Sequence, residues 1–173
     1  IRDAVFNKVS NTVVEGYART GAAYGEYPLY FSIQFNKPFK TLNGWNNDFV
    51  QTNVAQIAGK KDVGAFVSFT TMPNESILMK VGLSLVDLDG ARHNLDTELE
   101  PFGWNFEAAA AAARDQWNTL LSRIELKGSE LNKEKFYTNF YRSFAKQTWS
   151  DADGRYVDPH NKIQQLPKGG VMY

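Results

Sequence analysis

The residues best suited to chemistry in this sequence are acids that come in pairs, two positions apart. Such pairs occur at positions 87 and 89, 98 and 100, and 151 and 153, among others. A glycosidase needs two carboxyl groups, one to protonate the leaving group and one to act as base or nucleophile. Residues two apart on a strand are separated by roughly 6.5–7 Å, near the lower limit of about 6.5–9.5 Å for an inverting enzyme. The spacing permits this chemistry, although acids two apart are also common on ordinary protein surfaces.

Two of these pairs are followed by glycine, as at the start of a calcium-binding loop. The two segments are Asp87-Leu88-Asp89-Gly90 and Asp151-Ala152-Asp153-Gly154. A calcium loop of the EF-hand type needs glycine at its sixth position, and neither segment has it there. Asp-Gly is more typical of a turn. The two histidines, His93 and His160, have no nucleophile pattern around them and are interpreted as solvated or structural.

The best candidate for ligand binding is the stretch at residues 19–27. Its glycines and alanines are interleaved with arginine and tyrosine, a composition that favours an exposed loop over a strand. A guanidinium group and a phenol on such a loop can stack on a sugar and hydrogen-bond to its hydroxyl groups. We therefore predict that Arg19 and Tyr24 bind substrate. An ordinary connecting loop is the alternative interpretation.

Composition restricts the class of protein. The chain has 173 residues, of which 43% are hydrophobic and 14% aromatic, enough for one real core. Its 19 basic and 19 acidic residues are interspersed, so no basic surface for nucleic acid or an anionic membrane is expected. The absence of cysteine excludes disulfides and thiolate metal sites. No apolar run reaches the length of about eighteen residues that a membrane span needs.

The elements that must position these residues are first strands and then helices. Residues 29–35, 63–69 and 76–86 alternate between apolar and polar side chains, with turn-forming residues between them. Strands at this spacing predict an antiparallel β-sandwich.

Beyond residue 86 the apolar positions recur at the spacing of helices. Asp89 is expected to cap a short helix that ends at Pro101, and Asn105 to cap a helix of about five turns. Another long helix, with an aromatic face, is expected over residues 130–146. Trp117, on the apolar stripe, is predicted to be buried between the sandwich and the helices.

These patterns predict three parts of the chain. Residues 1–101 form a β-sandwich domain that is incomplete at its start, residues 102–128 a linker helix, and residues 129–173 the start of a helical (α/α) domain. Too few residues follow the last long helix to cover its aromatic face. Together with a first residue other than methionine, this leads us to expect a fragment or processed product of a longer protein.

Several segments occur in an order and spacing typical of one known family. They are Lys-Val-Gly-Leu-Ser at 80–84, Ala-Arg-His-Asn-Leu at 91–95, Gly-Trp-Asn-Phe at 103–106, Trp-Asn at 117–118, Ile124, Phe-Tyr-Thr-Asn-Phe-Tyr-Arg-Ser at 136–143 and Asp-Ala-Asp-Gly-Arg-Tyr at 151–156. This series resembles the junction region of glycoside hydrolase family 92. Gly-Tyr-Ala-Arg at 16–19 and the segments at 30–31 and 37–39 resemble strands of that family's amino-terminal sandwich. The resemblance spans nearly the whole chain.

The resemblance implies an exo-acting, calcium-dependent α-mannosidase that inverts the anomeric carbon and combines an amino-terminal β-sandwich with an (α/α)6 barrel. It implies mannose-containing glycans and the remaining barrel domain as partners, and a secreted or periplasmic bacterial protein. The family's general acid, base and calcium ligands lie in barrel segments beyond Tyr173, so the chain alone is expected to be inactive and to hold no catalytic or metal-binding residue. One departure from the family is Ala22-Ala23-Tyr24, where many members have a glycine and a tryptophan.

A hypothesis from another class is a non-catalytic carbohydrate-binding or interaction module, in which the β-sandwich binds glycans and the helices form a stalk. The two hypotheses differ in whether several hundred helical residues follow Tyr173.

Overall fold

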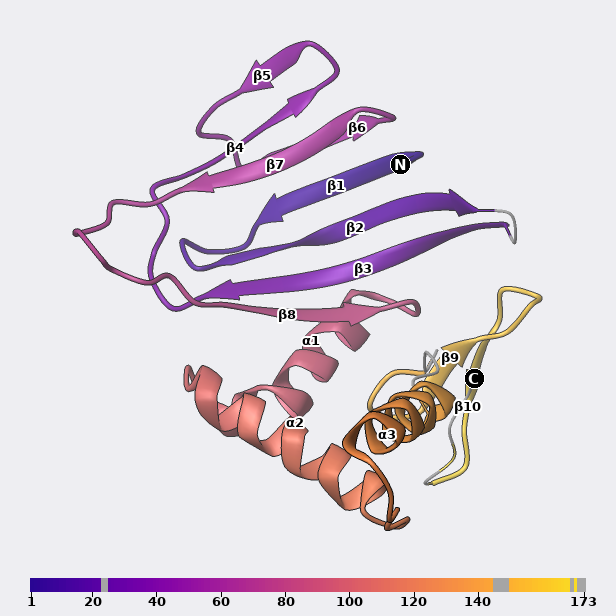
Figure 1. Ribbon diagram of the computed structural model, residues 1–173. Coiled ribbons are helices and arrows are strands. Elements are labelled where there is room, and N and C mark those ends of the chain that lie inside the picture. Colours follow the sequence, from indigo (N-terminus) through magenta and orange to yellow (C-terminus); the bar gives the residue numbers. More distant parts are fainter. Residues whose placement is uncertain (23–24, 145–149, 169, 171–173) are drawn as a thin grey trace. The chain divides into compact units, whose positions relative to one another are not determined.

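The computed structural model describes residues 1–22, 25–144, 150–168 and 170 (Figure 1). By their contacts, they form two compact units, one of residues 1–101 and 149–172 and the other of residues 102–148. The segment after residue 149 therefore groups with the sheets. The domain boundaries predicted at residues 101 and 128 stay predictions.

Residues 1–101 of the first unit contain two antiparallel sheets. The larger has the strand order β6-β1-β2-β3-β8, and the smaller has the order β5-β4-β7. The strands of the larger sheet are β1 (Asp3–Lys8), β2 (Val13–Ala22), β3 (Gly25–Phe35), β6 (Gln56–Lys60) and β8 (Met79–Ser84). Those of the smaller sheet are β4 (Thr41–Asn46), β5 (Phe49–Gln51) and β7 (Val63–Ser68).

The two sheets share one hydrophobic core, which confirms the predicted antiparallel β-sandwich. Its buried residues come from both sheets and from the segment that joins β3 to β4, and are Ala4, Val14, Phe31, Phe39, Leu42, Ile57 and Val63. Successive side chains of a strand point to opposite faces of the sheet. In β3, Phe31 and Ile33 therefore pack into the core, while Tyr30 and Ser32 lie on the outer face. The sequence pattern does not predict β4, β5 and β6, because glycine or asparagine interrupts the alternation of β4 and β6, and β5 has only three residues.

The stretch at residues 19–27 differs from the exposed loop expected from its composition. Arg19 lies within β2, where it pairs with Asp3 of β1 and Pro28 of β3, and β3 begins at Gly25. The expectation of a loop is wrong because the pairing of β2 with β3, which continues to Ala22 and Gly25, outweighs the low strand propensity of glycine and alanine. Figure 1 shows β2 and β3 as one long hairpin.

Helix α1 (Leu88–Glu98) packs on the outer face of the larger sheet, beside β8 (Figure 1). Glycine at position 82 permits this contact, because a Cβ there would lie 2.1 Å from the carbonyl oxygen of Ala91. The N-cap of α1 is Asp87, whose side chain accepts from the backbone N–H of Gly90, and not Asp89 as expected. A 3-10 turn, η1 (Glu100–Phe102), follows.

After residue 149 the chain forms a short hairpin of β9 (Arg155–Val157) and β10 (Ile163–Gln165). Asp158 stabilises the turn, since its Oδ1 accepts from the backbone N–H groups of His160 and Lys162. The sequence patterns do not predict this hairpin, because three-residue strands are too short to show an alternation.

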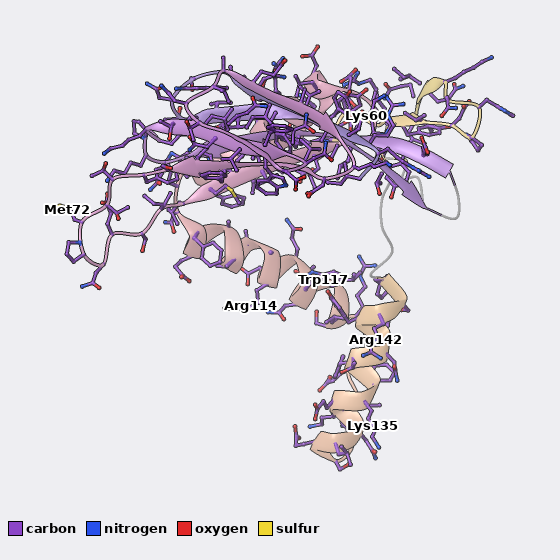
Figure 2. The ribbon with its side chains drawn as sticks, turned by 90° about the horizontal axis from the view of Figure 1, so that it is seen from above. Lys60, Met72, Arg114, Trp117, Lys135 and Arg142 are labelled. Atoms are coloured by element: carbon purple, nitrogen blue, oxygen red, sulfur yellow. The ribbon has the colours of Figure 1, made fainter. Side chains whose placement is uncertain are left out.

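The second unit consists of α2 (Phe106–Leu121) and α3 (Glu130–Phe144). Asn105 caps α2 as predicted, by accepting from the backbone N–H of Ala108 at 3.0 Å. Trp117 is half-buried, with its ring 4.4 Å from that of Tyr141 of α3, so the prediction of a buried Trp117 is wrong. Figure 2 shows Trp117 in the part of α2 next to α3. Among the described residues, no helix is both long and apolar enough to cross a membrane.

Candidate functional site

Three of the acids that suggested catalysis in the sequence, Asp87, Asp151 and Asp153, lie close together beside α1, whereas Glu100 pairs with Lys80 of β8. Asp151 is buried, with 6% of its surface exposed. Its Oδ2 accepts from the Ser84 hydroxyl at 2.8 Å, and its Oδ1 accepts from the Asn94 amide at 2.9 Å. Asn94 also donates to the Leu83 carbonyl and accepts from the N–H of Ala152. This network joins β8, α1 and the C-terminal segment.

The guanidinium group of Arg155 lies between two of the other acids. It donates to Asp87 Oδ2 and to Asp153 Oδ2, both at 2.8 Å. Burial by itself raises the pKa of Asp87, but hydrogen bonds from Arg155 and the Gly90 N–H outweigh it, and the net pKa is lowered. The pKa of Asp153 is lowered in the same way, against the effect of burial, by hydrogen bonds from Arg155. Both carboxylates are therefore ionised at neutral pH and unsuited to act as a general acid.

The two Asp-Gly segments do not form a calcium site. A Cβ at Gly90 would lie 2.2 Å from Asp151 Oδ2, so the segments pack directly against each other. The carboxylate oxygens that a cation would need are occupied by donors from Arg155, Asn94 and Ser84. Within residues 1–22, 25–144, 150–168 and 170, no three His, Cys, Asp or Glu side chains form a group that could hold a metal ion. Calcium needs six to eight converging oxygens, which this cluster does not offer.

A second buried acid, Glu15, connects α1 to the middle of the larger sheet. Glu15 is 4% exposed, and Arg92 of α1 binds both its carboxylate oxygens, at 2.9 and 2.6 Å. The Ser32 hydroxyl donates to the same carboxylate at 2.9 Å. The hydrogen bonds from Arg92 lower the pKa of Glu15, and they outweigh its desolvation. Glu15 is thus an ionised structural anchor for α1.

The remaining candidate surface is the outer face of the β2–β3 hairpin. The register places Tyr17 opposite Tyr30, and Arg19 opposite Asp3 of the neighbouring β1. Because side chains two apart share one face of a strand, these four residues lie on the same side of the sheet. The rings of Tyr17 and Tyr30 are 6.0 Å apart and tilted by 55°. We define these four residues, Asp3, Tyr17, Arg19 and Tyr30, as the hairpin face.

Polar contacts orient the side chains of the hairpin face. Arg19 Nε lies 3.4 Å from Asp3 Oδ2, with 45% of the arginine side chain exposed. A hydrogen bond to Asp3 raises the pKa of Tyr17, so its phenol keeps its proton and donates to the carboxylate. Tilted phenol rings beside an exposed ion pair can stack on a sugar ring and bind its hydroxyl groups. The arrangement is suited to binding a polar ring, not to proton transfer.

Of the two residues predicted to bind substrate, Arg19 lies on the hairpin face, and Tyr24 lies outside the described residues. The other three residues of the hairpin face, Asp3, Tyr17 and Tyr30, were not predicted as site residues from the sequence. The alternation of Tyr30 with the apolar residues of β3 was a usable signal, because it places that ring on the outer face. No pattern in the sequence could have pointed to Asp3, since its position beside Arg19 depends on the register between β1 and β2.

Two models of one protein family match the chain, one after the other. Residues 1–84 match the sequence model of the glycosyl hydrolase family 92 N-terminal domain, and residues 90–173 match that of the family's catalytic domain. The comparison with curated proteins found no match.

Solved structures resemble the chain over nearly its whole length. The family GH92 α-mannosidase BT3965 from Bacteroides thetaiotaomicron aligns with a TM-score of 0.86 and 22% identity, and has also been solved with mannoimidazole bound. The alignment covers 98% of this chain and 23% of that one. The GH92 inverting mannosidase BT2199 from the same organism gives a TM-score of 0.85 at 20% identity, covering 99% and 24%. At such identities the likeness shows the fold, and the chain spans about a quarter of the length of these enzymes.

Proposed function

The chain belongs to glycosyl hydrolase family 92, and from this membership we propose that it is the amino-terminal part of an exo-acting α-mannosidase that hydrolyses terminal α-linked mannose with inversion. The observation that carries the proposal is the match of both family domains, in order, along residues 1–84 and 90–173. The similar folds include a mannosidase bound to mannoimidazole and an inverting mannosidase. We place the enzyme in the periplasm of a bacterium or outside the cell.

Catalysis in this proposal takes place in the part of the enzyme that the chain does not span. An inverting glycosidase needs one carboxylic acid with a raised pKa and one carboxylate that activates water on the opposite side of the sugar. In this chain the pKa values of Glu15, Asp87 and Asp153 are lowered, and arginines bind all three side chains. The calcium ion of the family would be held in the same missing part, the remainder of an (α/α)6 barrel of which α3 is the first helix.

The role of this chain is then to build one wall of the sugar pocket. We propose that the hairpin face and Tyr24 border the bound mannoside. The planar guanidinium of Arg19 can hydrogen-bond to two neighbouring hydroxyl groups of a sugar, and the tyrosines add apolar contact to its C–H groups. These contacts orient the substrate and take no part in bond cleavage.

The test measures hydrolysis of an α-linked mannobiose by residues 1–173 and by the longer enzyme of which we propose they are the amino-terminal part. Each protein is assayed with calcium and after calcium has been removed by a chelator. We expect turnover only in the longer enzyme, abolished by chelation, with β-mannose as the first product in proton NMR. Turnover by residues 1–173 alone, or α-mannose as the first product, would contradict the proposal. A longer protein that binds mannobiose without hydrolysing it would support the competing hypothesis of a carbohydrate-binding module.

Arg19→Ala in the longer enzyme should lower kcat/KM for the mannobiose about tenfold, which corresponds to about 1.4 kcal/mol of lost binding in the transition state. The free energy of unfolding should change by less than about 1 kcal/mol, because solvent reaches both side chains of the ion pair, 45% of Arg19 and 28% of Asp3 being exposed. Arg114→Ala, an exposed arginine on α2 (Figure 2), is the matched control and should leave kcat/KM unchanged. Equal kcat/KM in the wild type and Arg19→Ala would contradict the proposal that the hairpin face contacts the substrate.

A further inference from the structure

The smaller sheet carries an exposed tryptophan in a fixed orientation. Trp45 of β4 lies over Gly64 of β7, since a Cβ at Gly64 would lie 2.2 Å from the indole Cζ2 and 2.3 Å from Cη2. The indole N–H donates to Asp62 Oδ1 at 2.9 Å, and the Asp62 carbonyl accepts from the Asn47 N–H. Glycine thus makes room for the ring and Asp62 sets its orientation. One face of the indole packs on backbone, while 37% of the residue stays exposed.

Further apolar side chains lie on the same outer face. The register places Val50 of β5 directly opposite Trp45, and Phe66 of β7 opposite Asn43, which is two residues from Trp45 along β4. Val50 is 68% and Phe66 46% exposed. Residues two apart on a strand are separated by roughly 7 Å, so the indole and the Phe66 ring occupy successive positions along the strand.

Hydroxyl groups continue this face beyond Phe66. Thr41 and Ser68 are paired in the register, and the Asn43 amide donates to both hydroxyl oxygens, at 2.9 and 3.3 Å. Because each hydroxyl accepts from the amide, its own hydrogen points elsewhere and can be donated. The face therefore runs from an indole ring through a phenyl ring to two hydroxyl groups. We call the set Thr41, Trp45, Val50, Phe66 and Ser68 the β4 platform.

The dimensions of the β4 platform favour a small ligand over a protein. Three strands about 4.8 Å apart, each of at most six residues with a rise of about 3.4 Å, give a face of about 300 Å². A stable protein–protein interface buries about 800 Å² on each partner. A pyranose ring has apolar C–H faces that stack on aromatic rings, and hydroxyl groups at its edge that pair with protein hydroxyls. The platform offers both kinds of partner in a row.

We propose that the β4 platform is a second carbohydrate site, which binds a neutral oligosaccharide of at least two pyranose rings along β4. Trp45 stacks on one ring, Phe66 contacts the next, and Thr41 and Ser68 donate to its hydroxyl groups. The site goes beyond the proposed function, because it lies on the smaller sheet while the hairpin face belongs to the larger one. It would hold an extended glycan against the protein without any part in bond cleavage.

The experiment is affinity electrophoresis of residues 1–173 through native gels that contain yeast mannan, laminarin or xylan. At least one polysaccharide should retard the wild type, and Trp45→Ala should weaken that binding at least tenfold. Trp104→Ala is the matched control, because Trp104 is similarly exposed at 39% but lies in the other unit, and its retardation should equal that of the wild type. Gly64→Val should also abolish retardation, since it displaces the indole without removing it.

Circular dichroism of each variant checks folding, and Phe66→Ala, expected to weaken binding about threefold, replaces any variant that fails to fold. No retardation by any of the three polysaccharides, or equal retardation of wild type and Trp45→Ala, would overturn the proposal. So would a dimer in sedimentation that Trp45→Ala dissociates without any polysaccharide binding, since a second copy would then cover the platform. The gel measures binding and the mannobiose assay measures turnover, so failure of this inference and failure of the proposed function are distinguishable.

Discussion

Replacing Asn94 with alanine is expected to lower the free energy of unfolding of residues 1–173 by about 3 kcal/mol. The buried Asn94 amide is bonded to three different groups, which are the Asp151 carboxylate, the Leu83 carbonyl and the Ala152 N–H. Alanine leaves these partners without the amide, and a buried donor or acceptor that loses its partner costs about 1–3 kcal/mol. The loss should appear as a lower midpoint in urea denaturation, with an unchanged slope.

The control for this variant is Asn118→Ala, an exposed asparagine of α2. Both substitutions gain the same small amount of helix propensity, so the difference between them isolates the hydrogen bonds. Asn118→Ala should change the free energy of unfolding by less than about 0.5 kcal/mol. Similar midpoints for the two variants would mean that Asn94 does not join α1 to β8 and the C-terminal segment in solution.

Gly82→Ala should destabilise the first unit by about 3 kcal/mol, the upper end of the range for an overpacked core. The added methyl group would lie 2.1 Å from the Ala91 carbonyl oxygen and 2.6 Å from Leu95 Cβ. A backbone carbonyl within a helix cannot rotate away, so α1 as a whole must move off the sheet. The separation would also weaken the contact between Arg92 and Glu15. Urea denaturation followed by far-ultraviolet circular dichroism measures the effect.

Gly128→Ala provides the matched comparison, because among the described residues the nearest atom to a Cβ at Gly128 is Asn132 Cβ, at 3.9 Å. That variant should be neutral or more stable by up to about 1 kcal/mol, since alanine restricts the unfolded chain. If Gly82→Ala were as stable as Gly128→Ala, α1 could not pack on β8 as closely as the structure has it.

Much of the fold follows from local patterns in the sequence. Alternation at residues 29–35 and 63–69 predicts strands β3 and β7, and the recurrence of apolar residues after Asn105 predicts α2 with its cap. These elements are predictable because one face of each meets the core, or a neighbouring helix, at regular intervals. Strands β4 and β6 are not predicted, because they are stabilised by strand pairing and by the burial of Leu42 and Ile57, in spite of the glycines and asparagines in these segments.

The functional residues divide in a similar way. The sequence alone determines that Arg19 sits among small residues and tyrosines, and that acids occur in pairs beside glycines. The sequence also contains the segments that resemble family 92. The matches to both family models confirm that the chain belongs to this family. Side-chain type and spacing are enough for these conclusions, because each conclusion depends only on residues within a few positions of one another in the chain.

Only the tertiary structure decides what those groups do. Asp87 and Asp153 look like catalytic or calcium-binding acids in the sequence, but Arg155 binds both of them, and Asn94, from 57 positions away, donates to the buried Asp151. Asp3 lies beside Arg19 because the register of β1 and β2 pairs these two residues. The indole of Trp45 can pack on β7 because Gly64, beneath it, has no side chain. The physical reason is that the protonation and orientation of a side chain depend on the groups packed around it. Those groups come from strands and helices that are distant in the sequence.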